Sequence, residues 1–136
     1  MCEANGGLRV SRFLWICLGG AAGTGARYLL SGWALQILGA GYPWGTLAVN
    51  LLGSFFIGAI MHVGLTTQLI SPTLRLALAT GVLGGFTTYS SFNSEPLQLL
   101  QGGAWRMGFV NVAGMVLGCL VAGAAGLGAA RLALGH

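Results

Sequence analysis

Hydrophobic residues form four long stretches along the chain, separated by short polar or glycine-rich segments. The stretches cover residues 13–38, 44–65, 73–100 and 104–134. A helix needs roughly 20 mostly apolar residues to cross about 30 Å of hydrocarbon, and each stretch is long enough. The connecting segments are too short to hold a soluble domain. The pattern therefore predicts an all-α membrane protein with four transmembrane helices, a single domain over residues 1–136, and a disordered tail at residues 1–8.

The scarcity of charge supports this prediction. Of 136 residues, 55% are hydrophobic and only 6% are charged, and the mean hydropathy is +0.81. Soluble domains carry about 25% charged residues, because their surface faces water. The formal net charge of +4 comes from arginines scattered singly among the apolar stretches, so we predict no nucleic-acid partner.

The arginines also indicate an orientation. Four spans place both termini on one side of the membrane, together with Arg9, Arg12, Arg75 and Arg131, whereas Arg106 falls on the other side. Cytoplasmic loops carry the excess of positive charge, so the first side is expected to be the cytoplasmic one. We expect a multi-pass protein of the cell (plasma or inner) membrane.

Several kinds of enzyme chemistry are excluded by the residues that the chain lacks. It has no lysine and no aspartate, and its only carboxylates are Glu3 and Glu95. A phosphate-binding Walker loop and a Schiff-base enzyme both need a lysine, and a glycosidase-type mechanism needs two neighbouring carboxylates. The three cysteines form no CxxC motif, and the two histidines lie far apart in sequence. We predict that the protein is not an enzyme.

Burying a polar side chain in the membrane costs free energy, so polar residues inside the apolar stretches indicate functional positions. Arg27 lies in the middle of the first stretch; it forms either a structural pair or an anion-attracting vestibule. Thr46, Asn50 and Ser54 share one helical face of the second stretch. The Asn50 amide either bonds another helix or offers its two donors to a bare anion.

The third stretch carries the densest polar cluster, at residues 84–96. Gly84 and Gly85 weaken helical geometry, and Pro96 has no N–H to donate. A broken helix leaves backbone N–H and C=O groups without helical partners. In a membrane such groups are tolerated only around a buried ion or a water-filled path. Tyr89 and Phe92 share a face and offer positive ring edges to an anion. We predict a third helix broken near its middle that holds an ion site; the alternative is a kink beside two core aromatics.

Three motifs in this order, at residues 19–28, 43–50 and 84–92, resemble the CrcB/Fluc fluoride channels over nearly the whole chain. The resemblance implies a fluoride-selective channel that exports fluoride passively and so lowers its cytoplasmic concentration. It also implies an antiparallel dimer with two narrow pathways and a structural Na⁺ ion on the dimer axis.

The resemblance further implies a role for particular residues. Gly84 and Thr87 supply carbonyl groups to the sodium ion, Arg27 lies in the vestibule, and Glu95 closes the third motif. The fluoride pathway is lined by a set of amide, ring and hydroxyl side chains: Asn50, Tyr89, Phe92, Ser91 and Thr88.

This chain departs from the family at several points. Tyr89 stands where phenylalanine is usual. The family's fourth helix commonly carries hydroxyls at every fourth residue, whereas here the registers 109/113/117 and 110/114/118 are apolar, with only Asn111 and Cys119 polar nearby. The arginine bias favours one fixed orientation, which fits poorly with an identical chain inserted both ways. The second subunit is therefore either an identical chain or, as in some family members, a paralogue of fixed, opposite orientation.

Two other functions remain as alternatives. A small four-helix cation or drug exporter needs a carboxylate in its first span, where this chain has Arg27. A membrane subunit without transport activity accounts for the glycine-rich helices but not for the polar cluster of the third stretch.

Overall fold

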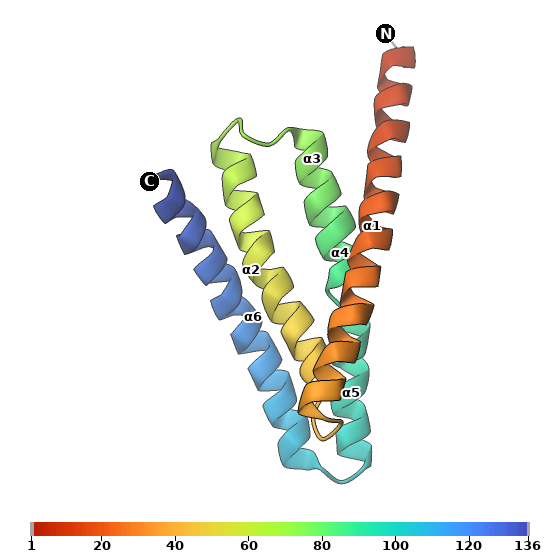
Figure 1. Ribbon diagram of the computed structural model, residues 1–136, viewed down its shortest axis with the longest axis vertical. Coiled ribbons are helices and arrows are strands. Elements are labelled where there is room, and N and C mark those ends of the chain that lie inside the picture. The colour runs from red at the N-terminus through yellow and green to blue at the C-terminus, as the bar shows by residue number, and fades with distance from the viewer. Residues whose placement is uncertain (1, 136) are drawn as a thin grey trace.

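The computed structural model describes residues 2–135, and within that range all its regular secondary structure is helical. Figure 1 shows four rods: α1 (Cys2–Leu38), α2 (Trp44–Thr66), a third rod in segments, and α6 (Trp105–Leu134). The predicted all-α class is confirmed, and the predicted ends of the second and fourth stretches lie within one residue of α2 and α6. Helix α1 begins earlier than expected, because it includes residues 2–8, for which the sequence predicts a tail.

The third rod consists of α3 (Pro72–Leu76), the π-helix η1 (Ala77–Leu83), α4 (Gly84–Phe86) and α5 (Tyr89–Gln101). Two extended residues, Thr87 (φ −77°, ψ 160°) and Thr88 (φ −145°, ψ 114°), separate α4 from α5. Pro96 lies inside α5 and is buried there, so the helix continues past it. The expectation that Pro96 helps to interrupt the rod is wrong: the helical geometry stops at the two threonines instead.

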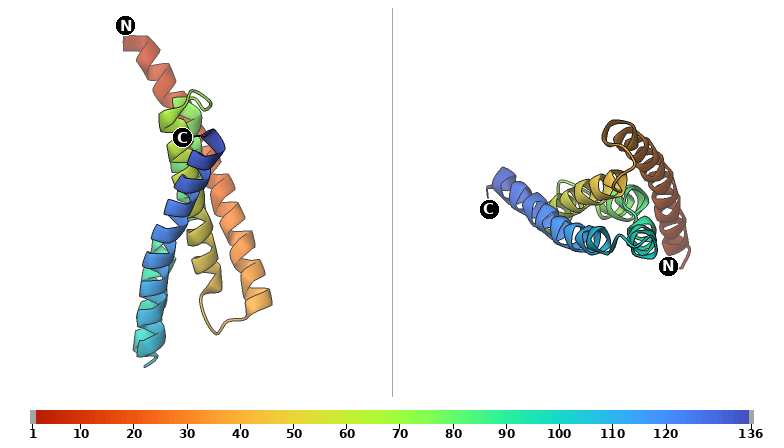
Figure 2. Two further views of the ribbon diagram at one scale, coloured as in Figure 1. Left: turned by 90° about the vertical axis from the view of Figure 1, so that its left-hand side faces the viewer. Right: turned by 90° about the horizontal axis from the view of Figure 1, so that it is seen from below.

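The rods are arranged so that both termini lie at one end of the molecule (Figure 1). Helix α2 packs mainly against α6, and α1 packs mainly against η1 and α4. Seen along the rods, α1 and α6 lie at the two outer edges, with α2 and the third rod between them (Figure 2). Below the interruption, α5 packs against α6. The interrupted segment therefore lies between α1 and α2, in the middle of the bundle.

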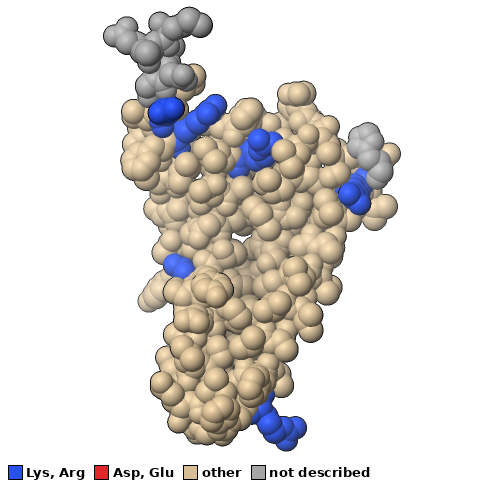
Figure 3. Space-filling model, turned by 180° about the vertical axis from the view of Figure 1, so that it is seen from behind, with Lys and Arg blue, Asp and Glu red and all other residues tan. Residues whose placement is uncertain are grey.

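The surface is that of a chain in an apolar environment. By length and composition, α2 and α6 are apolar enough to cross a membrane. Large apolar side chains stay exposed on α1 and α6, for example Leu18 and Leu29 on α1 and Phe109 and Leu120 on α6. Figure 3 shows basic side chains gathered at the two ends of the molecule, with an almost uncharged zone between them. A continuous apolar surface of this kind faces lipid or another protein chain.

Glycines bring the rods into close contact. A Cβ atom built on Gly126 of α6 would lie 1.9 Å from the Phe55 carbonyl oxygen of α2, and one on Gly23 of α1 would lie 2.0 Å from the Val82 carbonyl oxygen. In lipid, where apolar burial does not drive helices together, such backbone contacts allow the dispersion attraction that holds them. The depth of α2 relative to α6 is therefore set by backbone atoms, which have little freedom to move.

Replacing Gly126 by alanine tests this packing. The new methyl group would meet the α2 backbone, and overpacking of this kind costs about 1–3 kcal/mol. We expect a lower thermal unfolding midpoint for Gly126→Ala in detergent. The matched control is Gly128→Ala on the same helix, where a Cβ meets nothing within 4 Å. Equal midpoints for the two variants would contradict close α2–α6 contact.

Candidate functional site

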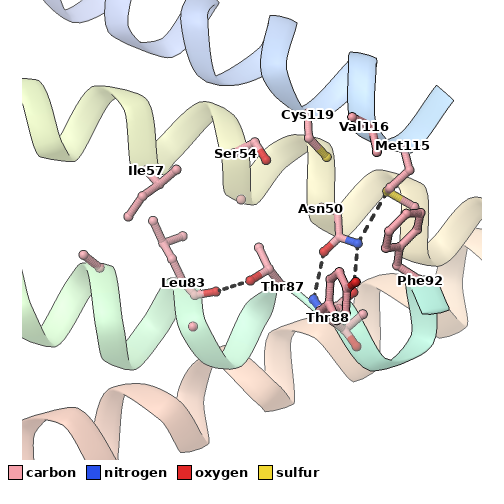
Figure 4. Close-up of a pocket in the computed structure, with 14 residues that line it drawn as sticks. Asn50, Ser54, Ile57, Leu83, Thr87, Thr88, Phe92, Met115, Val116 and Cys119 are labelled. Atoms are coloured by element: carbon pink, nitrogen blue, oxygen red, sulfur yellow. Dashed lines mark hydrogen bonds between the residues drawn. The ribbon is translucent and has the colours of Figure 1, made fainter. Parts of the chain in front are cut away.

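The largest concentration of predicted site residues lies in a cavity of about 430 Å³ between α2, the third rod and α6 (Figure 4). No residue of α1 lines it. The cavity brings together six of the residues that the sequence predicts: Asn50, Gly84, Thr87, Thr88, Tyr89 and Phe92. Its other walls are mostly apolar and come from α2, from the third rod above the interruption and from α6: Gly53, Ser54, Ile57, Ala79, Leu83, Met115, Val116 and Cys119.

The side chain of Asn50 bonds the backbone at the interruption. The Thr88 N–H donates to Asn50 Oδ1 at 2.8 Å, and Asn50 Nδ2 donates to the Thr88 carbonyl oxygen at 3.0 Å. Both residues are buried, at 8% and 6% exposure. Backbone groups buried away from water need partners. The Asn50 amide therefore replaces the helical hydrogen bond that the Thr88 N–H does not make, and it adds a further donor to the Thr88 carbonyl.

This bonding leaves carbonyl groups on both sides of the interruption without their helical donors, and two of them belong to predicted site residues. In a continuous helix the N–H of Thr88 would reach the Gly84 carbonyl, and that of Ser91 would reach the Thr87 carbonyl. Here the Thr88 N–H goes to Asn50, and the Ser91 N–H donates to Thr88 Oγ1 at 3.2 Å as the cap of α5. Gly84 and Thr87 both line the cavity, and their carbonyl oxygens lack these helical donors; Gly84 is exposed.

A group of hydroxyls surrounds the start of α5. Thr88 Oγ1 lies 3.1 Å from Ser91 Oγ and 3.1 Å from Ser90 Oγ. Thr88 lines the cavity. Ser91 does not line it, but its hydroxyl is hydrogen-bonded to that of Thr88. The cap of α5 and the hydroxyl wall of the cavity are therefore the same side chain.

The two aromatic residues of the third motif form an edge-to-face pair. The ring centroids of Tyr89 and Phe92 lie 5.6 Å apart with an interplanar angle of 65°. Both rings line the cavity. Tyr89 is 76% exposed in the single chain, so one side of the cavity opens outward. The rings are held in the first turn of α5, directly after the interruption.

Two predicted residues lie elsewhere. Arg27 is half-buried on α1 and does not line the cavity. Glu95 lies one turn below Phe92 on α5, where its Oε1 accepts a hydrogen bond from Thr46 Oγ1 of α2. The second carboxylate oxygen, Oε2, is buried with no partner among the described residues. The structure thus links Glu95 to the polar face of α2 without placing it in the cavity wall.

The contribution of α6 was missed in the sequence. Met115 and Cys119 line the cavity, and Asn111 lies one turn before Met115. Asn111 is fully buried, and neither polar atom of its side chain has a partner among the described residues. These three residues follow a four-residue spacing, one residue beyond the register 110/114/118 that was considered. The one polar signal available was that Asn111 and Cys119 stand two turns apart.

Comparison with known proteins gives the family. Residues 14–127 match the family model described as "CrcB-like protein, Camphor Resistance (CrcB)". The chain belongs to the CrcB family. The resemblance indicated by the three motifs is thereby confirmed, over most of the sequence.

Curated relatives of this CrcB chain carry a consistent name. A protein of Sorangium cellulosum (strain So ce56) is 56% identical over 122 residues, which cover 90% of this chain and 96% of the relative. One of Anaeromyxobacter sp. (strain K) is 51% identical over 113 residues, covering 83% and 90%. One of Geobacter sulfurreducens is 48% identical over 122 residues, covering 90% and 98%. Each is named "Fluoride-specific ion channel FluC". These names describe channels, in agreement with the prediction that the chain is not an enzyme.

The bonding of Thr88 by Asn50 is testable without any transport measurement. Asn50→Leu leaves the buried Thr88 N–H without a partner, which costs about 1–3 kcal/mol. We expect a lower unfolding midpoint and faster hydrogen exchange at the Thr88 amide. The control is Asn93→Leu, since Asn93 is exposed on α5. Unchanged exchange at Thr88 in Asn50→Leu would show that the side chain does not hold the interruption.

Proposed function

We propose that the chain is a fluoride-selective ion channel through which fluoride leaves the cytoplasm passively, so that its cytoplasmic concentration falls. The names and coverage of the curated relatives support this function. The observation that carries it within this chain is the cavity, where a buried amide, a hydroxyl cluster and two ring edges meet at an interruption of the third rod.

The chemistry of these groups suits a small, tightly hydrated anion. Fluoride must exchange its water shell for other hydrogen-bond donors and positive edges. The Asn50 amide and the Thr88 hydroxyl offer such donors in the cavity wall, and the Ser91 hydroxyl offers one next to Thr88. The positive ring edges of Tyr89 and Phe92 complete the pathway. Chloride is larger and is a weaker hydrogen-bond acceptor, so a narrow path with fixed donors favours fluoride. Arg27 attracts anions towards the vestibule, and Glu95 marks the end of the motif.

We further propose that the interruption at Thr87 and Thr88 is the break in a third transmembrane helix and that it holds a structural Na⁺ ion. The freed carbonyl groups of Gly84 and Thr87 fit this role, because hard cations prefer oxygen ligands. When bound, the ion supplies a fixed positive charge that offsets the carbonyl dipoles. Its place on the axis of an antiparallel dimer follows the pattern of the family.

A second subunit is supported by the open side of the cavity. Tyr89, at 76% exposure, and the exposed Gly84 lie where another chain would close the pathway. The partner is an identical chain or a paralogue of opposite orientation. All four rods cross the plasma (inner) membrane. The arginines favour a subunit whose terminal end lies in the cytoplasm, because Arg9, Arg12, Arg75 and Arg131 lie at that end and Arg106 lies at the other; a partner of opposite orientation faces the other way.

Anion efflux from liposomes that hold the purified chain tests the proposal. We expect rapid release of fluoride while chloride is retained. Such a result also establishes a functional homodimer. If the folded chain alone releases no fluoride, co-reconstitution with a paralogous subunit tests the heterodimer; release in neither case would overturn the channel function.

Phe92→Ile tests the role of the ring edge. An aliphatic side chain keeps the wall apolar but removes the positive edge, so we expect fluoride efflux to fall by at least about tenfold, the effect of about 1.4 kcal/mol. The protein should elute at an unchanged position in size-exclusion chromatography. Phe109→Ile is the control, because Phe109 is 65% exposed on α6 and does not line the cavity. Normal efflux through Phe92→Ile would reduce Phe92 to a packing residue.

A further inference from the structure

One N–H group of the Asn50 amide has a weak partner. The amide nitrogen carries two hydrogens, of which one goes to the Thr88 carbonyl oxygen at 3.0 Å. The other is directed to the sulfur atom of Met115 on α6, with Nδ2 and Sδ 3.5 Å apart (Figure 4). A thioether sulfur is a poor hydrogen-bond acceptor compared with any oxygen. The second N–H of Asn50 therefore has a partner, but the hydrogen bond to that partner is weak.

The direction of this N–H is fixed. Because Asn50 both accepts from and donates to the backbone of Thr88, its amide plane cannot rotate without losing two good hydrogen bonds. Asn50 is 8% exposed and Met115 is 3% exposed, so bulk water does not compete for the donor. Any group that takes this N–H must therefore occupy the place of the Met115 sulfur.

Met115 is able to give up that place. Methionine is unbranched, with three rotatable side-chain bonds, and it adapts to irregular spaces. Its side chain borders the cavity of about 430 Å³, together with Phe92 and Cys119. Rotation of the thioether into this space exposes the donor of Asn50 next to the ring of Phe92, where an anion in the cavity reaches it.

We infer that Met115 is a positioning residue for anion binding: its sulfur is an exchangeable partner for the second N–H of Asn50 and sets the anion concentration at which that donor is released. The inference rests on the proposed channel function. An anion that is a strong hydrogen-bond acceptor, as fluoride is, displaces the sulfur and accepts the hydrogen bond from Asn50. The sulfur keeps the buried N–H paired when no anion is present, so the empty site does not carry an unsatisfied donor.

The test is Met115→Leu. Leucine has nearly the same volume, so the packing is retained, but it offers no acceptor to compete with the anion. A weak hydrogen bond lies at the low end of the usual net range, so the fluoride concentration for half-maximal efflux should fall about two- to fivefold. Met107→Leu is the matched control on the same helix, since Met107 is 40% exposed and does not line the cavity.

A second readout does not depend on transport. The side-chain amide signals of Asn50 in ¹H–¹⁵N spectra should shift with added fluoride, with a lower midpoint in Met115→Leu than in the wild-type chain or in Met107→Leu. Equal or higher midpoints in Met115→Leu, or Asn50 signals that ignore fluoride while the wild-type chain conducts it, would overturn the role of Met115 and leave the channel intact. A wild-type chain that conducts no fluoride, alone or with a paralogue, would instead overturn the proposed function.

Discussion

The pair of hydrogen bonds between the Asn50 side chain and the backbone of Thr88 is the interaction on which the site depends. A polypeptide that leaves helical geometry in an apolar environment exposes N–H and C=O groups that water does not satisfy. One amide side chain satisfies both groups of the critical residue at once. It does so from a neighbouring helix, and for that reason the interruption is tied to the depth of α2. That depth is in turn set by glycine contacts between α2 and α6, where backbone meets backbone.

The same hydrogen bonds create the features that surround them. Once the Thr88 N–H is taken by Asn50, the Gly84 carbonyl loses its helical donor, and the capping of α5 by Thr88 frees the Thr87 carbonyl in the same way. The restart of the helix at Tyr89 then puts Tyr89 and Phe92 one turn apart beside the freed carbonyls. Oxygen ligands, hydroxyls and ring edges thus lie within a few residues of one another because of a single local departure from helical bonding.

The extent to which the sequence predicts this structure varies with the kind of signal. Apart from the start of α1, the ends of the rods were predictable, because a long apolar stretch bounded by Gly, Pro or Gln forms a helix that ends near those residues. The importance of Asn50 was also predictable, since a buried amide must find partners, although its partner Thr88 was not. The effect of Pro96 was misjudged, because a proline inside a helix is tolerated where the lost hydrogen bond falls beside other packed rods. The π-helical turn of η1 depends on backbone register, which has no residue signature in this stretch.

The face of α6 that lines the cavity was hidden for a different reason. Helix α6 is apolar almost all round, so periodicity does not tell which side faces the interior. The structure selects the side that carries Asn111, Met115 and Cys119. Met115 and Cys119 give the cavity wall two sulfur atoms where the family commonly carries hydroxyls, and Asn111 lies one turn away from that wall. For an anion in the cavity, this asymmetry has a physical logic. In the proposed channel, donors on α2 and at the start of α5 would favour entry of an anion, whereas the sulfur atoms of the α6 wall would add little to its binding energy. Conduction requires that an ion bind strongly enough to enter and weakly enough to leave, and under the proposed function a cavity with strong partners on one side only would suit both conditions.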